Sequence, residues 1–313
     1  MRTRRFGRND FQVSELSLGT WGLSGDGYGP VQDSEVDRVI DRALELGVTL
    51  FETADVYGAG AMEKKLGARL DAKNTHIVTK IGTFVEDGVG HKRFDAKSLA
   101  VAFDNSQQRI GRDKLDVVLL HNPTVTALQA GEASAFLRER VEAEQLRCWG
   151  VSAGSEEVAN AAIDLGADVV ELAYNAFHQH TLHALSDRLA MTDTAVLARS
   201  VLAHGLLAGH WIPNKTFFEH DHRAHRWTKD GLEYRRQQLR ALRAFVRNDV
   251  VTLRSVALRF VLSNELVTTA VLGPRTLTQL NQLCRESGGE PPYLDEETMR
   301  ELPKRLQAIG VAL

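Results

Sequence analysis

Four side chains capable of acid–base chemistry stand at or just beyond the ends of three apolar segments. Glu52 and Tyr57 belong to the segment LFETADVYGAG (residues 50–60), Lys80 ends the segment HIVTK, and His121 ends the segment VVLLH. Parallel α/β barrels hold their reactive side chains at the carboxyl ends of their strands. The order of these residues therefore predicts one polar site on one rim of a barrel.

These residue types suit the reduction of a carbonyl group by a nicotinamide. A tyrosine is a weak acid with an ordinary pKa of about 10, and a nearby ammonium favours its phenolate. A carboxylate can hold that ammonium in place, and a histidine can orient a carbonyl through a hydrogen bond. We predict these four roles for Tyr57, Lys80, Glu52 and His121. Each residue alone is also what a solvated rim position would carry.

Eight short runs rich in Val, Ile and Leu recur along the chain. They lack the alternation of apolar and polar residues that a half-exposed sheet shows, and continuous apolar runs are typical of a parallel sheet buried on both faces. The predicted strands cover residues 16–20, 49–53, 76–81, 115–121, 146–151, 168–173, 195–200 and 268–272.

Amphipathic segments separate these strands. The clearest covers residues 34–46 and stops before Gly47, and further helices are predicted over 95–111, 130–143, 155–165 and 181–189. Eight strands with crossover helices predict an α/β protein with a (β/α)8 barrel, formed as a single domain over 1–313 behind an N-terminal hairpin at 2–13. A doubly wound open sheet agrees less well, because GTWGL after the first strand lacks the GxGxxG spacing.

One region interrupts the alternation of strands and helices. Residues 205–231 are polar, aromatic and rich in His, and they exceed the length of an ordinary connection. A long insertion after the seventh strand, on the active-site side of a barrel, predicts a lid. The charged segment 230–247 predicts an additional helix that is mainly a solvated face.

Composition excludes several classes of protein. The 313 residues carry a formal net charge of −3, which gives no basic footprint for nucleic acid. The basic start MRTRRFGRNDF is not followed by an apolar run, and no stretch approaches the roughly 20 apolar residues of a membrane span. Cys148 and Cys284 are far apart, so we expect buried, reduced thiols in a cytoplasmic protein.

Nearly the whole chain resembles the aldo-keto reductase superfamily. The resemblance rests on LSLGTW, TADVYG, IVTKIG, VVLLHNP, WGVS, AYN and SVLAHGLLAG, which follow that family's order. It implies an NADPH-dependent enzyme that interconverts small carbonyl compounds and alcohols, with Tyr57, Lys80 and His121 in the roles given above. The fourth position, five residues before the tyrosine, is normally aspartate in the family and is Glu52 here.

The resemblance also implies which residues meet the nicotinamide. Thr20 and Trp21 match the segment beside the ring, and Ser152 matches a serine that contacts the carboxamide. Glu171 replaces the family's glutamine, and Arg199 stands where an aromatic ring often stacks. An ionised Glu accepts a hydrogen bond from an amide NH2 but donates none, whereas Arg offers a planar face.

Two further segments resemble the family's phosphate-binding residues. Those of the pyrophosphate segment are Ser200, Leu202 and Gly205. The eighth strand leads into VLGPRT, where Gly273, Arg275 and then Gln279 resemble the clamp on the adenosine phosphate. A guanidinium binds phosphate through a rigid fork, so Arg275 is the predicted partner of the 2′-phosphate of NADPH.

Two groups of histidines invite a metal-site interpretation. They are His178, His180 and His183 after the sixth strand, and His220, His222 and His225 around Asp221. Their spacing is not that of a zinc motif, so we predict no metal. The second group resembles the DHR-containing lid of some aldo-keto reductases.

Two other functions stay open. One is an NADP(H)-binding protein with weak turnover, because Glu52, Ala153 and Glu171 depart from the family's pattern around the nicotinamide. The other is a lyase or isomerase that reuses the same acid–base residues. Polar lid residues favour a polar, sugar-like carbonyl substrate. NADPH titration followed by a panel of carbonyl compounds would separate the three functions.

Overall fold

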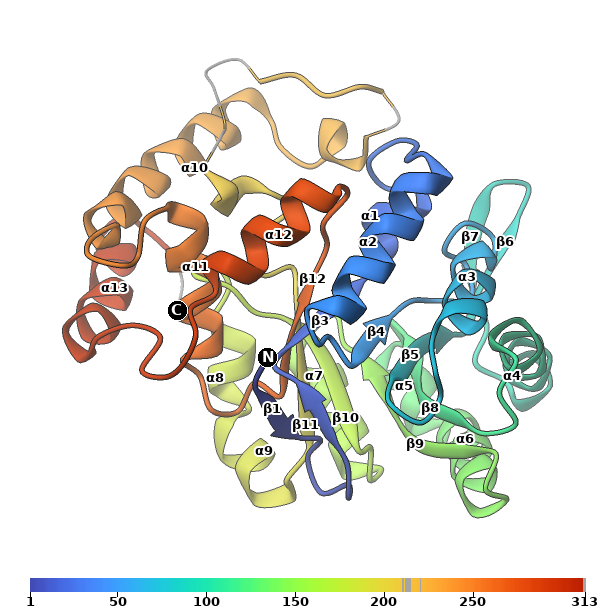
Figure 1. The fold of residues 1–313 in the computed structure, drawn as a ribbon. Coiled ribbons are helices and arrows are strands. Elements are labelled where there is room, and N and C mark those ends of the chain that lie inside the picture. Colours follow the sequence, from blue (N-terminus) through green and yellow to red (C-terminus); the bar gives the residue numbers. More distant parts are fainter. Residues whose placement is uncertain (210, 212–214, 220, 312–313) are drawn as a thin grey trace.

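The computed structural model describes residues 1–209, 211, 215–219 and 221–311. Its centre is a closed barrel of eight parallel strands surrounded by helices (Figure 1). The strands, in order around the barrel, are β3 (Leu16–Gly19), β4 (Leu50–Glu52), β5 (His76–Ile81), β8 (Leu115–His121), β9 (Leu146–Ser152), β10 (Val169–Ala173), β11 (Ala195–Arg199) and β12 (Thr269–Leu272). The predicted barrel and its eight strands are confirmed.

Apolar side chains fill the barrel interior and close one end. Leu50, Val117 and Leu119 are completely buried in a cluster that also takes in the N-terminal hairpin of β1 (Thr3–Arg5) and β2 (Gln12–Ser14). Phe6 and Phe11, from the turn of this hairpin, stack with ring centroids 4.7 Å apart. The interior is thus a packed core, and the opposite, carboxyl end of the strands is left for a site.

Helices cover the outside of the barrel and bury apolar side chains against it, and α11 is buried on all sides. They are α2 (Asp33–Glu45), α3 (Ala61–Arg69), α4 (Ala96–Ile110), α5 (Val125–Gln129), α6 (Glu132–Glu142), α7 (Glu156–Asp164), α11 (Leu253–Leu262) and α12 (Leu277–Glu286). The helix predicted over 181–189 is instead two short helices, α8 (His180–Ala184) and α9 (Ser186–Thr192), divided at the buried Leu185.

Other elements stand at the carboxyl rim or pack against the outer layer. The short α1 (Trp21–Ser24) follows β3, and a hairpin of β6 (Thr83–Glu86) and β7 (Val89–Lys92) follows β5. Among the described residues of the insertion, two short 3-10 turns, Leu206–Ala208 and His222–His225, precede the first turn of α10 at its end. This insertion lies above the rim in Figure 1, as a lid would.

The additional helix predicted over 230–247 is present and exposes charged residues such as Glu233, Arg240 and Arg243, but it also has a buried face that was not predicted. Helix α10 (Lys229–Leu242) continues into a 3-10 turn, Arg243–Phe245, and packs against α13 (Glu296–Ala308) and α11. It buries Leu232, Leu239 and Leu242, because these residues recur at helical spacing on one side beneath the charged side chains.

Within the described ranges, no helix is long and apolar enough to cross a membrane. Cys148 is buried and Cys284 is half-buried, and both thiols are free. Burial raises the pKa of Cys148 well above its ordinary value, which makes that thiol a poor nucleophile.

Candidate active site

Three neighbouring strands deliver the predicted acid–base residues to one rim. Glu52 is the last residue of β4, Lys80 is the next to last of β5, and His121 is the last of β8. Tyr57 follows β4 in a turn that is held to β5 by the hydrogen bond from Asp55 N to Lys80 O, at 3.0 Å. The strand order brings these residues together although up to 69 positions separate them in the chain (52 to 121).

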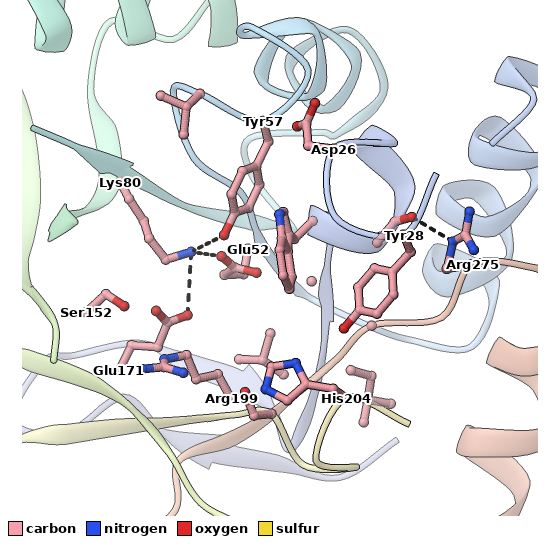
Figure 2. Close-up of a pocket in the computed structure, with 18 of the residues that line it drawn as sticks. Asp26, Tyr28, Glu52, Tyr57, Lys80, Ser152, Glu171, Arg199, His204 and Arg275 are labelled. Carbon is pink, nitrogen blue, oxygen red and sulfur yellow. Dashed lines mark hydrogen bonds and ion pairs between the residues drawn. The ribbon is translucent and has the colours of Figure 1, made fainter. Parts of the chain in front are cut away.

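Lys80 is the centre of this cluster, as Figure 2 shows. Its Nζ atom contacts a carboxylate oxygen of Glu52, lies 3.4 Å from the hydroxyl of Tyr57 and lies 3.6 Å from Oε1 of Glu171. It also donates to the carbonyl of Thr53 at 3.2 Å. The Lys80 side chain is 3% exposed, so its charge needs these partners.

Burial dominates the electrostatics of the tyrosine and the lysine. It raises the pKa of Tyr57 above its ordinary value, and the Glu171 carboxylate adds to the rise. It lowers the pKa of Lys80 to about 8, while Glu171 opposes that shift. The sequence-based expectation of a Tyr57 pKa lowered by an ammonium is therefore wrong in its net direction, because burial and Glu171 outweigh it. The phenol is held in its protonated form, ready to donate.

Glu52 stands where aspartate is normal in the family, and its longer side chain fits because the neighbouring residue on β3 is Gly19. A Cβ atom on Gly19 would lie 2.9 Å from Oε2 of Glu52 and 2.8 Å from Cγ1 of Val271. The absence of a side chain at Gly19 leaves room for the extra methylene of glutamate. Glu52 therefore keeps its contact with Lys80 without folding aside.

His121 faces the phenol across the site. Its ring and that of Tyr57 are 6.2 Å apart in an edge-on arrangement, and Lys92 donates to its backbone carbonyl at 2.6 Å. Burial, followed by the positive charge of Lys80, lowers the pKa of His121 well below its ordinary value. Its Nδ1 atom is buried and has no partner among the described residues, so a neutral imidazole is free to bond a ligand.

A cavity of about 1110 Å³ opens over these residues. Of the predicted site residues, those that line it are Trp21, Glu52, Tyr57, Lys80, His121, Ser152, Glu171, Arg199, Ser200, Leu202, Gly205, Gly273, Arg275 and Gln279. Thr20 lies behind the wall, fully buried, and its hydroxyl donates to the Glu52 carbonyl at 3.0 Å. Thr20 thus supports the end of β4 and is not among the lining residues.

The part of the cavity beside Lys80 has groups that suit a carboxamide. Ser152 ends β9, and Glu171 points an unpartnered, buried Oε2 atom away from Lys80. Arg199, at the end of β11, donates to the carbonyl of Ala153 at 3.2 Å. A buried acceptor without a partner in the described residues is a group that an amide NH2 would satisfy.

The segment after β11 adopts an unusual backbone at the cavity wall. Ser200, Ala203 and His204 all have positive φ, between 47° and 57°, although none is a glycine. Gly205 continues the turn with a φ of 88°. Such left-handed residues cost free energy and cluster at ligand-binding sites, and they open the backbone toward a phosphate.

Arg275 reaches across the far end of the cavity. It donates to the carbonyls of Gly22 at 3.2 Å, Gly29 at 2.8 Å and Pro30 at 3.2 Å, and its own N–H donates to Gln279 at 2.8 Å. Arg275 therefore ties the loop after α1 to the start of α12. Its Nη1 atom takes no part in these contacts, and Arg275 is one of the residues that line the cavity.

Several lining residues lie outside the set predicted from the sequence. Asp26 and Tyr28 come from the loop after α1, and Thr83 and Phe84 come from the unexpected hairpin. The guanidinium of Arg223 lies 4.8 Å from the ring of Tyr28 and pairs with Asp221. The DHR sequence was the available signal for Arg223, whereas the others depend on loop geometry.

The lid segment is held over the cavity by its contact with this loop. The His222 N–H donates to the Gly27 carbonyl at 2.9 Å, and the His222 ring packs on Trp21 and Tyr28. In the described part of the chain, no group of three or more potential ligands is arranged to hold a metal ion. His220 falls outside the described residues.

Comparison with known proteins identifies the family to which this barrel and its polar rim belong. The profile of the Aldo/keto reductase family matches residues 15–300, and the chain belongs to this family of nicotinamide-using oxidoreductases. The D-threo-aldose 1-dehydrogenase of a Pseudomonas species is 27% identical over 296 residues, which cover 86% of this chain and 88% of that protein.

Two solved structures show how far the fold is shared. The glycerol dehydrogenase of Gluconobacter oxydans superposes with a TM-score of 0.86 at 23% identity, covering 99% of this chain and 97% of that chain. The holo form of an aldo-keto reductase from Bacillus halodurans gives 0.81 at 22% identity, covering 100% and 98%. At these identities the likeness is one of fold.

Proposed function

We propose that this protein is an NADPH-dependent aldo-keto reductase in which Tyr57 transfers the proton. The observation that carries the proposal is the contact of the buried Lys80 with both Glu52 and the Tyr57 hydroxyl, on the wall of a large cavity. A protonated phenol next to an anchored ammonium is a suitable acid for a developing alkoxide. A bound nicotinamide would supply the hydride.

His121 orients the substrate in this proposal. Because its imidazole is neutral, it can donate one hydrogen bond to a carbonyl oxygen that lies between it and Tyr57. In the reverse direction, Tyr57 takes the hydroxyl proton of an alcohol. Lys80 then stabilises the phenolate while it exists.

The cofactor is proposed to lie along the wall from Trp21 to Gln279. Ser152 and Glu171 would hold the carboxamide, and the left-handed turn from Ser200 to Gly205 would hold the pyrophosphate. Arg275 would meet the 2′-phosphate through its remaining Nη1 atom, which makes NADPH the favoured form.

A small polyhydroxylated compound is the proposed substrate class. Besides the residues assigned to the cofactor, the cavity is lined by the polar residues Asp26, Asp55, Asn105 and Asn122. The named activities of two relatives, an aldose dehydrogenase and a glycerol dehydrogenase, agree with this chemistry. Aldoses and triose carbonyls are therefore the first compounds to assay.

The test is turnover and binding with matched cofactors. Fluorescence titration should show tighter binding of NADPH than of NADH, and oxidation of NADPH should depend on an added aldose or triose. Binding without turnover of any carbonyl compound or alcohol would favour a cofactor-binding role. Absence of binding would favour the non-redox alternative.

A further inference from the structure

Lys80 has two carboxylate neighbours. One is Glu52 at the end of β4, and the other is Glu171 of β10, which approaches from across the barrel (Figure 2). The distance from Lys80 Nζ to Glu171 Oε1 is 3.6 Å, and the two side chains are 3% and 1% exposed. The site therefore holds one ammonium between two buried carboxylates.

A carboxylate as deeply buried as Glu171 requires a cation or several donors nearby. In the described residues, Lys80 is the cation that lies within 4.0 Å of Glu171. Arg199 is on the adjacent strand but gives a hydrogen bond to the Ala153 carbonyl. The charge of Glu171 is thus compensated first by Lys80, which couples the two residues.

The two carboxylate oxygens of Glu171 have different surroundings. Oε1 is turned toward Lys80, while the buried Oε2 has no partner among the described residues. A neutral amide at this position would serve a carboxamide as well, but it would attract an ammonium less strongly because it carries no charge. The presence of a charge at residue 171 therefore points to Lys80.

We propose that Glu171 is a positioning residue of the acid–base couple, which holds Lys80 beside Tyr57 together with Glu52. This inference rests on the proposed function, in which Tyr57 moves the proton. Glu171 touches Lys80 and acts on the phenol through it. Its Oε2 atom stays free to contact the cofactor.

The titratable groups that face Lys80 set the expected pH effect. They are Glu52, Tyr57, His121, Glu171 and Arg199, with Asp55 and Lys92 beyond them. The Glu171 carboxylate raises the pKa of Lys80, so its removal lets burial lower that pKa further. For an ion pair at this distance, we expect the pKa of Lys80 to fall by about one unit or more when the Glu171 charge is removed.

The first experiment measures the coupling without cofactor or substrate. Thermal unfolding is compared for the wild type, Glu171→Gln, Lys80→Met and the double variant. If the two residues are paired, the Tm loss of the double variant is smaller than the sum of the single losses by about 2 °C or more. Glu15→Gln is the matched control, because Glu15 is 3% exposed at the other end of the barrel and bonds Tyr293. Its effect should add to that of Lys80→Met.

The second experiment asks whether the pair acts on the chemistry. In Glu171→Gln, the alkaline fall of kcat/KM should begin at lower pH than in the wild type, and Glu171→Asp should restore part of the shift. Asp55→Asn separates another group that titrates here, because burial raises the pKa of Asp55 to about 8. In Asp55→Asn, the pH profile of kcat/KM should keep the alkaline fall that is assigned to Lys80.

The two experiments distinguish a failure of the Glu171–Lys80 pairing from a failure of the proposed reductase function. Additive unfolding effects of Glu171→Gln and Lys80→Met would overturn the pairing. Coupled unfolding with an unchanged alkaline limb would also overturn the inference and leave Glu171 a structural or cofactor contact. Coupled unfolding in a protein that turns over no carbonyl compound would support the pairing and count against the proposed function alone.

Discussion

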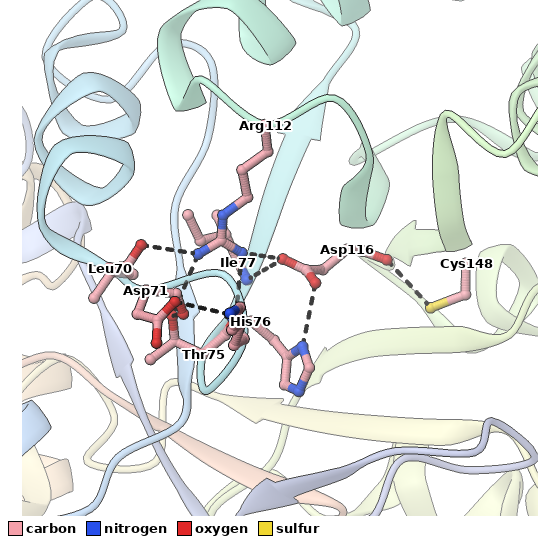
Figure 3. A network of polar contacts seen from close by, with 9 residues as sticks. Leu70, Asp71, Thr75, His76, Ile77, Arg112, Asp116 and Cys148 are labelled. Atoms are coloured by element: carbon pink, nitrogen blue, oxygen red, sulfur yellow. Dashed lines mark hydrogen bonds and ion pairs between the residues drawn. The ribbon is translucent and has the colours of Figure 1, made fainter.

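The barrel carries a polar cluster at each end, partly buried at the amino end and buried at the carboxyl end, and the two clusters differ in how their hydrogen-bonding groups are used. At the amino end, Asp116 accepts from the Ile77 N–H at 3.0 Å, contacts His76 Nδ1 at 3.2 Å and pairs with Arg112 (Figure 3). Arg112 also donates to the carbonyls of Thr75 and Leu70. None of these polar side chains has a buried atom without a partner.

At the carboxyl end, His121 and Glu171 each keep a buried atom without a partner in the described structure, and a large cavity adjoins them. The pKa of Tyr57, Lys80 and His121 is shifted by burial there. A satisfied network stabilises a fold, whereas an incomplete one next to a cavity is completed by a ligand. Clusters of carboxylates and basic side chains therefore serve structure at one end and, we propose, chemistry at the other.

The largest expected effect is on stability, at the amino end. Asp116→Ala leaves Arg112 without its carboxylate, and the free energy of unfolding should fall by about 3 kcal/mol. Urea denaturation measures this, and kcat of the remaining folded protein should be unchanged. Asp113→Ala, at an exposed site in the same turn, should change stability by less than about 0.5 kcal/mol. A large loss of kcat in Asp116→Ala would show that the amino-end cluster also affects the chemistry, so that the two ends would not differ in role.

Tyr57→Phe should have the converse effect at the carboxyl end. The phenyl ring keeps the packing but has no proton to give, so kcat should fall by about 10²-fold or more. Unfolding and NADPH affinity should stay close to those of the wild type, as measured by urea denaturation and fluorescence titration. Tyr234→Phe, on the outer face of α10, is the control with unchanged kcat. An active Tyr57→Phe would remove the phenol from the mechanism.

Arg275→Ala tests the cofactor end of the cavity. Both NADPH and NADH should bind more weakly, because the loop held through Gly22, Gly29 and Pro30 is released. NADPH should lose about 1.5–3 kcal/mol more than NADH if a charged hydrogen bond to the 2′-phosphate is broken. Arg285→Ala, at a 75% exposed position near the end of the following helix α12, should preserve both affinities. Equal losses would show that Arg275 only anchors the loop.

The smallest expected effect is that of Glu52→Asp. The shorter carboxylate withdraws from the space above Gly19, but Glu171 still holds Lys80, so kcat should change by less than about tenfold. Steady-state kinetics on the preferred carbonyl compound measures the change. A large gain in carbonyl reduction would mean that the natural site is not tuned for that reaction.

Much of the barrel could be predicted because its signals are local. Continuous apolar strands, helical spacing over 34–46 and the polar residues that end each strand all depend on near neighbours in sequence. Helix α3 and the β6–β7 hairpin were not predicted, since short segments of mixed composition carry weak periodicity. The buried face of α10 was not predicted, because its three leucines are spread through a charged segment and their burial depends on packing against α11 and α13.

The barrel, the rim on which Glu52, Lys80 and His121 stand, and the resemblance to the family could all be inferred from the residues alone. The contacts that these residues make became visible only in the folded protein. It showed that Gly19 makes room for Glu52, that Glu171 approaches Lys80 from across the barrel, and that Arg275 holds the loop after α1. These contacts join segments more than 30 and up to about 250 positions apart. Only closure of the barrel brings such segments within hydrogen-bonding distance, so no local pattern in the sequence records them.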